Sequence, residues 1–273
     1  MSQNPAARVT PALSVDSLSF SVRHSKAGQP DQPILRDLTL QVKTREFVSI
    51  VGPSGCGKST LLNFVAGLQH VQSGSITFAS DSRDGVTPLG YMFQQHALLP
   101  WLTVQKNVEL GLDIAGVAAP EQRQRAAATI ADMGLAGYED HYPSQISGGM
   151  CQRVSLARTL VTNPDLILMD EPFGALDAQT RIFIQQMFSR YWEEHKKTVL
   201  LVTHDLAEAI FLSDRILVMG ARPGRIVAEY AVNIPRPRDA DSLRTSPEFN
   251  ILLSALWQEI KRYSQFGGGA HDG

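Results

Sequence analysis

Residues 52–60 read Gly-Pro-Ser-Gly-Cys-Gly-Lys-Ser-Thr, a glycine-rich segment that ends in a lysine and two hydroxyl side chains. Glycines let successive backbone N–H groups turn toward one polyanion, the lysine adds a positive charge, and a hydroxyl can bind magnesium. This combination is typical of a loop that holds nucleotide phosphates. The sequence therefore predicts a nucleoside triphosphate and Mg2+ as ligands, with these binding residues: Gly52, Pro53, Ser54, Gly55, Cys56, Gly57, Lys58, Ser59 and Thr60.

Two carboxylates follow a second informative run, Leu166-Ile-Leu-Met, at Asp170 and Glu171. Ligands of open α/β sheets bind at the carboxyl ends of buried strands, where this pair would lie. Asp170 could share a magnesium ion with Ser59. Glu171 could accept a proton from, or orient, the water that attacks the γ-phosphate.

A third segment, Ser147-Gly148-Gly149, opens an apolar helical pattern that stops at Asn163-Pro164. A serine cap and free N–H groups at a helix N-terminus attract an anion. Without further context, however, most such segments are simple helix caps.

The elements that must position these residues can be predicted from hydrophobic periodicity. Residues 46–51 suit a buried strand and residues 59–66 a helix, so the phosphates would meet a helix N-terminus. Residues 103–133 are mostly helix formers and predict a helical insertion. Near-continuous apolar runs predict a parallel sheet covered on both faces, with strands at 166–170, 198–202 and 215–219. Further strands are expected at 13–22, 35–42, 74–78 and 89–93, the first two antiparallel around the loop 23–33.

Composition narrows the function classes. The chain has 273 residues, of which 43% are hydrophobic, and a net charge of −2, so no basic field favours nucleic acid. Its apolar runs are too short to span a bilayer, and its first residues lack the apolar stretch of a secretion signal, which favours the cytosol. The two cysteines, Cys56 and Cys151, both fall in nucleotide-binding segments, so a structural disulfide is not expected.

Residues 52–60 resemble the Walker A motif of the ATP-binding subunits of ABC transporters, Ser147-Gly148-Gly149 resembles their signature motif, and residues 166–172 resemble their Walker B motif. Gln94, residues 174–177 and His204 resemble the Q-loop, D-loop and switch histidine of that family. The resemblance runs from about residue 13 to residue 238. Trp101 and the segments 221–226 and 235–238 look most like the nitrate, sulfonate and taurine importers.

This resemblance implies an α/β fold: a RecA-like P-loop NTPase core with an N-terminal antiparallel β subdomain and an inserted α-helical subdomain. The expected division is a flexible tail at 1–12, an ATPase domain at 13–240 with its helical subdomain at about 95–160, a C-terminal helix at 241–265, and a disordered tail at 266–273. An apolar stripe in the C-terminal helix is expected to pack on its own domain.

The resemblance also implies ATP hydrolysis in a head-to-tail dimer, in which ATP lies between one phosphate loop and the partner's signature segment. Catalytic roles would fall to Lys58, Gln94, Glu171 and His204. The nucleotide would also touch Ser147, Gly148, Gly149 and Asp177, and Mg2+ would bind Ser59, Gln94 and Asp170. Expected partners are a membrane permease, which docks near residues 94–102 with Leu99, Trp101 and Leu102, and indirectly a periplasmic solute-binding protein. The subunit would sit at the cytoplasmic face of the inner membrane.

The sequence leaves the adenine contact, the transported solute and the composition of the dimer open. Adenine could stack on Phe20, on a residue of the loop 23–33, or only weakly at Val22. The transported solute could be an oxyanion, a sulfonate or a pyrimidine-like nutrient, and the pair could be a homodimer or a heterodimer. An alternative is an ABC-type ATPase that acts on nucleic acid or ribosomes. A small GTPase is disfavoured because no Asn-Lys-x-Asp segment occurs. The arginines 222, 225, 236 and 238 are expected to form a solvated face.

Overall fold

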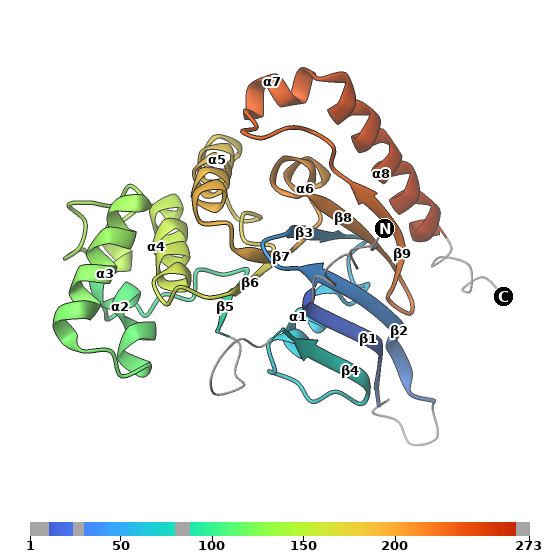
Figure 1. Cartoon of the computed structure of the whole chain (residues 1–273), viewed down its shortest axis with the longest axis horizontal. Coiled ribbons are helices and arrows are strands. Elements are labelled where there is room, and N and C mark those ends of the chain that lie inside the picture. Colours follow the sequence, from blue (N-terminus) through green and yellow to red (C-terminus); the bar gives the residue numbers. More distant parts are fainter. Residues whose placement is uncertain (1–10, 24–29, 80–87, 266–273) are drawn as a thin grey trace, which may run out of the picture.

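The computed structural model describes residues 11–23, 30–79 and 88–265, and it contains two sheets covered by helices (Figure 1). The expected tail at 266–273 lies outside the described residues, as do residues 1–10 and part of the loop 23–33. Residues 11 and 12, assigned to the N-terminal tail from the sequence, instead open the first strand.

A three-stranded antiparallel sheet has the order β2-β1-β4, as predicted for the first two strands. Its strands are β1 (Pro11–Val22), β2 (Gln32–Lys43) and β4 (Ser73–Phe78).

A six-stranded sheet has the order β5-β6-β7-β3-β8-β9, and its first five strands are parallel. The edge strand β9 is antiparallel to β8 and was not predicted, because its residues lack the apolar run of a buried strand. The strands of this sheet are β3 (Phe47–Val51), β5 (Leu89–Met92), β6 (Leu166–Asp170), β7 (Thr198–Thr203), β8 (Arg215–Gly220) and β9 (Arg225–Ala231).

Both faces of this sheet are buried, which explains the near-continuous apolar runs of its central strands. Along β3, Phe47 and Val51 face one core, whereas Val48 and Ile50 face the other. The first core includes residues of α5 (Ala178–His195), α6 (Leu206–Leu212) and α8 (Pro247–Gln265). The second includes α1 (Lys58–Val65) and the three-stranded sheet.

The predicted helical insertion is present as a group of three helices beside the sheets, at the left of Figure 1. It comprises α2 (Val104–Ile114), α3 (Ala119–Asp132) and α4 (Gly148–Leu160), with a 3-10 turn at Pro143–Gln145 before α4. At the other end of the chain, α7 (Ala240–Thr245) precedes α8, whose Phe249 and Leu256 are buried against the domain as expected. No helix in the described part of the chain is long and apolar enough to cross a membrane.

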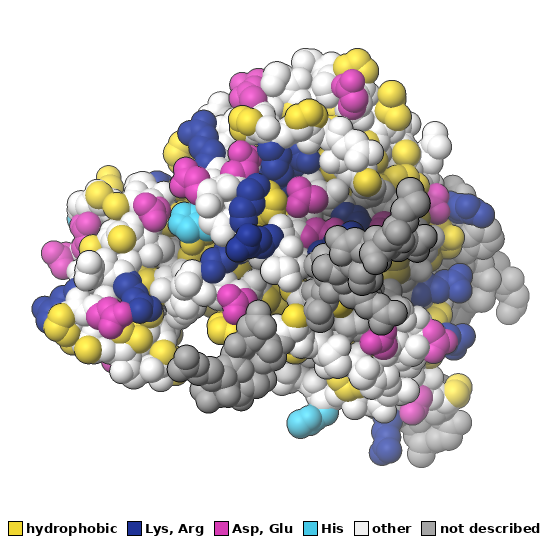
Figure 2. Space-filling model, viewed as in Figure 1, with side chains coloured by type: hydrophobic (Ala, Val, Ile, Leu, Met, Phe, Trp, Pro, Cys, Tyr) yellow, Lys and Arg dark blue, Asp and Glu magenta, His cyan; other side chains and the backbone are white. Residues whose placement is uncertain are grey.

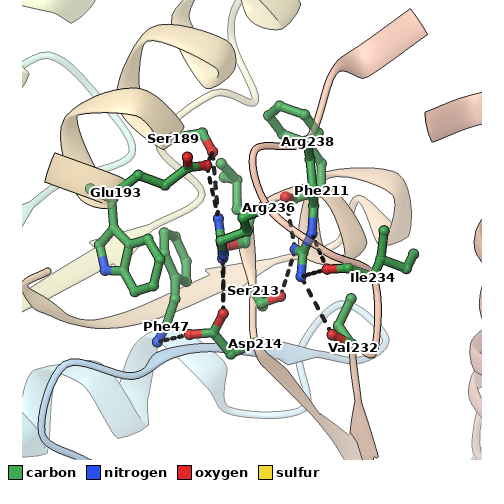
Figure 3. A network of polar contacts seen from close by, with 12 residues as sticks. Phe47, Ser189, Glu193, Phe211, Ser213, Asp214, Val232, Ile234, Arg236 and Arg238 are labelled. Carbon is green, nitrogen blue, oxygen red and sulfur yellow. Dashed lines mark hydrogen bonds and ion pairs between the residues drawn. The ribbon is translucent and has the colours of Figure 1, made fainter. Parts of the chain in front are cut away.

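The expectation that four arginines form a solvated face is wrong for two of them. Arg222 and Arg225 are exposed, but Arg238 is only 8% exposed and the Arg236 side chain only 13%. Both buried guanidinium groups bond to backbone carbonyls near the end of α6 (Figure 3). The sequence does not reveal these acceptors, because they lie more than twenty residues earlier in the chain.

A buried acid, Glu208, lies where α5 meets α6. One of its carboxyl oxygens accepts a hydrogen bond from Gln185 Nε2 at 2.8 Å, and the other, Oε1, has no protein partner. Burial raises the pKa of Glu208 to about 8, and the negative charge of Asp205 adds to the rise.

We expect Glu208→Gln to flatten the dependence of stability on pH. The folded state binds the Glu208 proton more tightly than the unfolded state, so the stability it contributes is complete below the unfolded pKa and is lost as the pH rises through about 8. Between about pH 6 and pH 8 the wild type should lose on the order of 2 kcal/mol that the variant keeps. Urea unfolding at both pH values measures this difference, and Glu248→Gln on the exposed surface is the control. A variant with the slope of the wild type would contradict the prediction.

Candidate active site

The register of the parallel strands brings the ends of four segments to one edge of the six-stranded sheet. Val51 at the end of β3 pairs with Thr203 at the end of β7, and Asp170 at the end of β6 pairs with Val202. Met92 at the end of β5 pairs with Met169. The loops that begin with Gly52, Phe93, Glu171 and His204 therefore all leave the sheet at this edge, where α/β proteins bind ligands.

The glycine-rich loop between β3 and α1 is closely packed and has a shape that needs glycine. A Cβ on Gly52 would lie 2.3 Å from the Met219 carbonyl oxygen of the neighbouring strand β8. Gly57 precedes α1 at a φ of 100°, in the left-handed region that favours glycine. No side chain caps the first turn of α1, which leaves its N–H groups available to an anion.

Lys58 and Cys56 differ in what they can offer to a ligand. Lys58 Nζ donates to the carbonyls of Gly52 at 2.9 Å and Pro53 at 3.1 Å, so the loop's own backbone holds the ammonium group across the loop. The Cys56 side chain is buried, and burial raises the pKa of its thiol. Only the backbone of Cys56 can therefore contribute to an anion site. Within the described residues both cysteines are free, as expected.

Ser59 and Asp170 form a pair of oxygen ligands between α1 and β6. Ser59 Oγ donates to Asp170 Oδ1 at 2.9 Å. Burial raises the pKa of Asp170 and the charge of Glu171 raises it further, against the hydrogen bond from Ser59 and the charge of Lys58. A hydroxyl and a carboxylate beside a polyphosphate loop are the hard oxygen donors that Mg2+ prefers. These residues therefore fit that ion.

Glu171 lies between two other expected site residues. Gln94 Nε2 donates to Glu171 Oε2 at 3.4 Å, and His204 Nδ1 lies 3.0 Å from the same oxygen. The backbone of Glu171 has a φ of 44°, which is uncommon for a residue with a side chain, while its N–H still bonds to the Val202 carbonyl at 2.8 Å. This turn keeps the carboxylate beside the glutamine and the histidine, a placement that suits orientation of a water molecule.

The segment Ser147–Gly149 lies apart from these residues. It forms the N-terminus of α4, where Ser147 Oγ accepts a hydrogen bond from Met150 N at 3.3 Å, and α4 belongs to the helical group of Figure 1. In the described part of the chain, no hydrogen bond joins this segment to residues 52–60. Within one copy of the chain, the two segments that could bind an anion are therefore not joined.

Asp177 and the two adenine-stacking candidates have local contacts in the structure. Asp177 caps α5 by accepting from Thr180 N at 3.0 Å, and hydrogen bonds with Thr180 lower the pKa of Asp177. Phe20 packs edge-on against Phe64 of α1 with ring centroids 5.0 Å apart, whereas Val22 is 46% exposed. Residues 24–29 of the third candidate, the loop 23–33, lie outside the described residues.

Three further residues connect the Gln94 segment to α4 and were not predicted. His96 Nδ1 bonds to Gln152 Oε1, and Gln152 Nε2 donates to the Pro172 carbonyl, next to Glu171. Arg158 donates to the carbonyls of Ala97 at 2.7 Å and His96 at 3.0 Å. The only signal in the sequence was that Gln152 lies about one turn, and Arg158 about three turns, into the helix after the Ser-Gly-Gly segment. These bonds therefore link α4 to residues close to Gln94 and to the residue after Glu171.

The loop 99–102 presents an exposed aromatic side chain, and hydrogen bonds to a buried asparagine fix its backbone. The buried Asn107 accepts from Leu99 N at 2.8 Å and donates to the carbonyls of Leu99 and Leu102 at 3.1 and 3.0 Å. Trp101, at the tip of this loop, is 69% exposed. An anchored loop with an exposed tryptophan is suited to binding another protein.

Comparison with known proteins agrees with this geometry. Residues 35–174 match the ABC transporter family. The chain is 46% identical to the aliphatic sulfonates import ATP-binding protein SsuB 1 of Mesorhizobium japonicum, covering 90% of this chain and 92% of the relative. It is 39% identical to the taurine import ATP-binding protein TauB of Escherichia coli O6:H1, covering 90% of this chain and all of the relative.

Solved structures point in the same direction. A dimeric, post-hydrolysis ATP-binding cassette bound to ADP and Pi matches with a TM-score of 0.69 and 33% identity, over 82% of this chain and the whole of that chain. The predicted fold class, a P-loop NTPase core with an antiparallel β subdomain and an inserted helical subdomain, is confirmed. The chain therefore belongs to the ABC transporter family and is an ATP-binding subunit with ATPase activity.

Proposed function

We propose that two copies of this chain close around ATP and Mg2+ and that hydrolysis energises a membrane importer for a small organic sulfonate or a related oxyanion. The observation that carries the proposal is the separation of two half-sites. Residues 52–59 and Glu171 lie at the edge of the sheet. Ser147–Gly149 forms the N-terminus of α4 in the helical group. A second copy, approaching head to tail, would supply the missing anion-binding helix N-terminus.

Within each composite site the residues have distinct tasks. Lys58 and the backbone N–H groups of residues 52–60 bind the phosphates, and Ser147–Gly149 of the partner bind them from the other side. Ser59 and Asp170 would hold Mg2+ together with Gln94, and that ion would neutralise charge on the phosphate oxygens. Asp177, next to the partner's site, would help to form the closed interface.

Glu171 and His204 act on the reaction itself. The Glu171 carboxylate accepts a proton from, or orients, the water that attacks the γ-phosphate. His204, whose side chain is 60% exposed beside Glu171, donates a hydrogen bond to the γ-phosphate. Gln94 donates a hydrogen bond to the same carboxylate. It belongs to the segment 94–97, which Arg158 and Gln152 connect to α4. Closure of the dimer would thus reach the loop 94–102.

The membrane partner docks on that loop, with Leu99, Trp101 and Leu102 against a helix of the permease. This places the subunit at the cytoplasmic face of the inner membrane, where a periplasmic solute-binding protein acts on it only indirectly. The names of the two importer relatives support a sulfonate or taurine as solute, and nitrate is the related oxyanion to test beside them.

The alternative, an ATPase that acts on nucleic acid or ribosomes, receives no support. The net charge is −2, and on the face shown in Figure 2 basic side chains lie among acidic ones. A protein that clamps a nucleic acid would be expected to present a continuous basic surface.

We expect Glu171→Gln to bind ATP but to lower turnover by about a hundredfold or more, because the amide cannot take the proton of the attacking water. The variant should elute as a dimer with ATP and as a monomer without it. Phosphate release and size-exclusion chromatography measure the two effects. Glu194→Gln on the exposed side of α5 is the matched control and should behave as wild type. Normal turnover of Glu171→Gln would remove this carboxylate from the reaction.

Trp101→Ala should weaken binding of the permease about tenfold or more, because an exposed tryptophan at an interface commonly dominates affinity. Its melting temperature should stay close to that of the wild type, since the side chain is 69% exposed. Co-purification with the permease subunits of the same import system, co-expressed with this chain, tests the prediction. Trp257→Ala, which removes another exposed tryptophan on α8, should co-purify normally. Equal recovery of permease with both variants would show that docking occurs elsewhere.

A further inference from the structure

Arg238 lies against the C-terminal end of α6, the short helix that follows His204. Its Nη1 donates to the carbonyls of Ile210 at 2.9 Å, Phe211 at 3.0 Å and Ser213 at 2.7 Å (Figure 3). On its other side the guanidinium donates to the Ile234 carbonyl. Arg238 therefore ties the segment after β9 to the end of a helix that lies about 25 residues earlier in the chain.

These bonds complete the end of α6. The last four carbonyls of a helix have no partner within it. In α6, Ser213 N bonds to the Ala209 carbonyl at 3.0 Å, Arg238 takes those of Ile210 and Phe211, and Arg236 Nη2 takes that of Leu212. The end is buried, so carbonyls without partners would destabilise it. A helix of seven residues cannot supply the missing stability itself.

Arg236 extends the same contacts to two other elements. It donates to Asp214 Oδ1, while Asp214 Oδ2 accepts from Phe47 N at 3.0 Å, at the beginning of β3. Its guanidinium also lies 3.8 Å from Glu193 on α5 (Figure 3). It lies 4.2 Å from the centre of the Trp192 ring. The two arginines thus join three elements: β3, which precedes the phosphate loop, α5, which follows Asp177, and α6, which follows His204.

The opposite end of α6 is held as well. Asp205, directly after His204, caps the helix through Ala207 N at 2.9 Å and Glu208 N at 3.1 Å. Arg181 of α5 bonds to Asp205 at 3.3 Å and to the Leu176 carbonyl at 3.0 Å. Because α6 has only two turns between these contacts, a shift of its C-terminal end would strain the Asp205 cap and so displace His204, the residue before it.

We infer that Arg238, with Arg236 beside it, is a positioning residue for ATP hydrolysis, which holds α6 so that His204 stays in reach of Glu171 and the γ-phosphate. The inference rests on the role proposed above for His204. Burial and the charge of Arg236 lower the pKa of Arg238 to about 10, so the guanidinium keeps its charge at neutral pH. Lysine at this position keeps a positive charge but cannot reach carbonyls on both sides, because its donors share one nitrogen.

A double-mutant cycle between Arg238→Lys and His204→Ala tests the inference. We expect Arg238→Lys to lower kcat about tenfold with KM for ATP within about twofold, because the phosphate loop is untouched while the histidine is displaced. In the His204→Ala background the same change should lower kcat less than about twofold. Arg225→Lys, at an exposed arginine of β9, is the matched control and should leave both constants unchanged.

If His204→Ala alone leaves kcat unchanged, the proposed role of His204 fails and the inference fails with it. If His204→Ala lowers kcat but the two losses multiply, only the inference is overturned. If Arg238→Lys does not fold, Arg236→Lys carries the same cycle, since it contacts the same helix end. Loss of folding in both would assign the arginines a purely structural role and overturn the inference.

Discussion

The register of the six-stranded parallel sheet is the constraint on which the rest of the structure depends. Both faces of the central strands are buried, and a shift of one residue would turn every apolar side chain of a strand to the wrong core. The register that satisfies both cores brings the ends of β3, β6 and β7 level with one another. Hydrophobic packing inside the domain thus decides where the polar groups at its edge meet.

In the proposed dimer, that edge holds only half of a phosphate site. The N-terminus of α4, the other anion-binding element, lies in the helical group, and Gln152 and Arg158 connect this helix to the Gln94 segment and to the backbone beside Glu171. The same hydrogen bonds that fix α4 in one copy would transmit a displacement of it. An ATPase built in this way can couple the approach of a partner to the geometry of its carboxylate, because the contact surface and the reactive residues share one set of bonds.

The segment after β9 is distant from the site motifs in the sequence, yet it contacts the end of the helix that follows His204. Helix α6 has a buried end whose last four carbonyls need donors, and the adjacent Ser213 N–H bonds to only the first of them, that of Ala209. Arg238 and Arg236 bond to the remaining carbonyls. Arg236 also contacts Glu193 of α5 and Asp214, which bonds to the beginning of β3. The C-terminal part of the chain is therefore part of the support of the ATPase core as well as a cover over the sheet.

By itself the sequence determined the glycine-rich loop, the carboxylates after β6, the main strands and the helical insertion, because each is encoded by neighbouring residues and by local periodicity. It also predicted that Gln94 and His204 belong to one site, through resemblance to a family. Tertiary structure alone decided that Arg238 is buried and Arg236 nearly so, that β9 forms an edge of the sheet, and that His96, Gln152 and Arg158 join α4 to residues 94–97. The physical reason is that each of these features depends on a backbone carbonyl or a sheet edge in a distant segment that needs a hydrogen-bond partner. The local sequence does not indicate which distant groups need one.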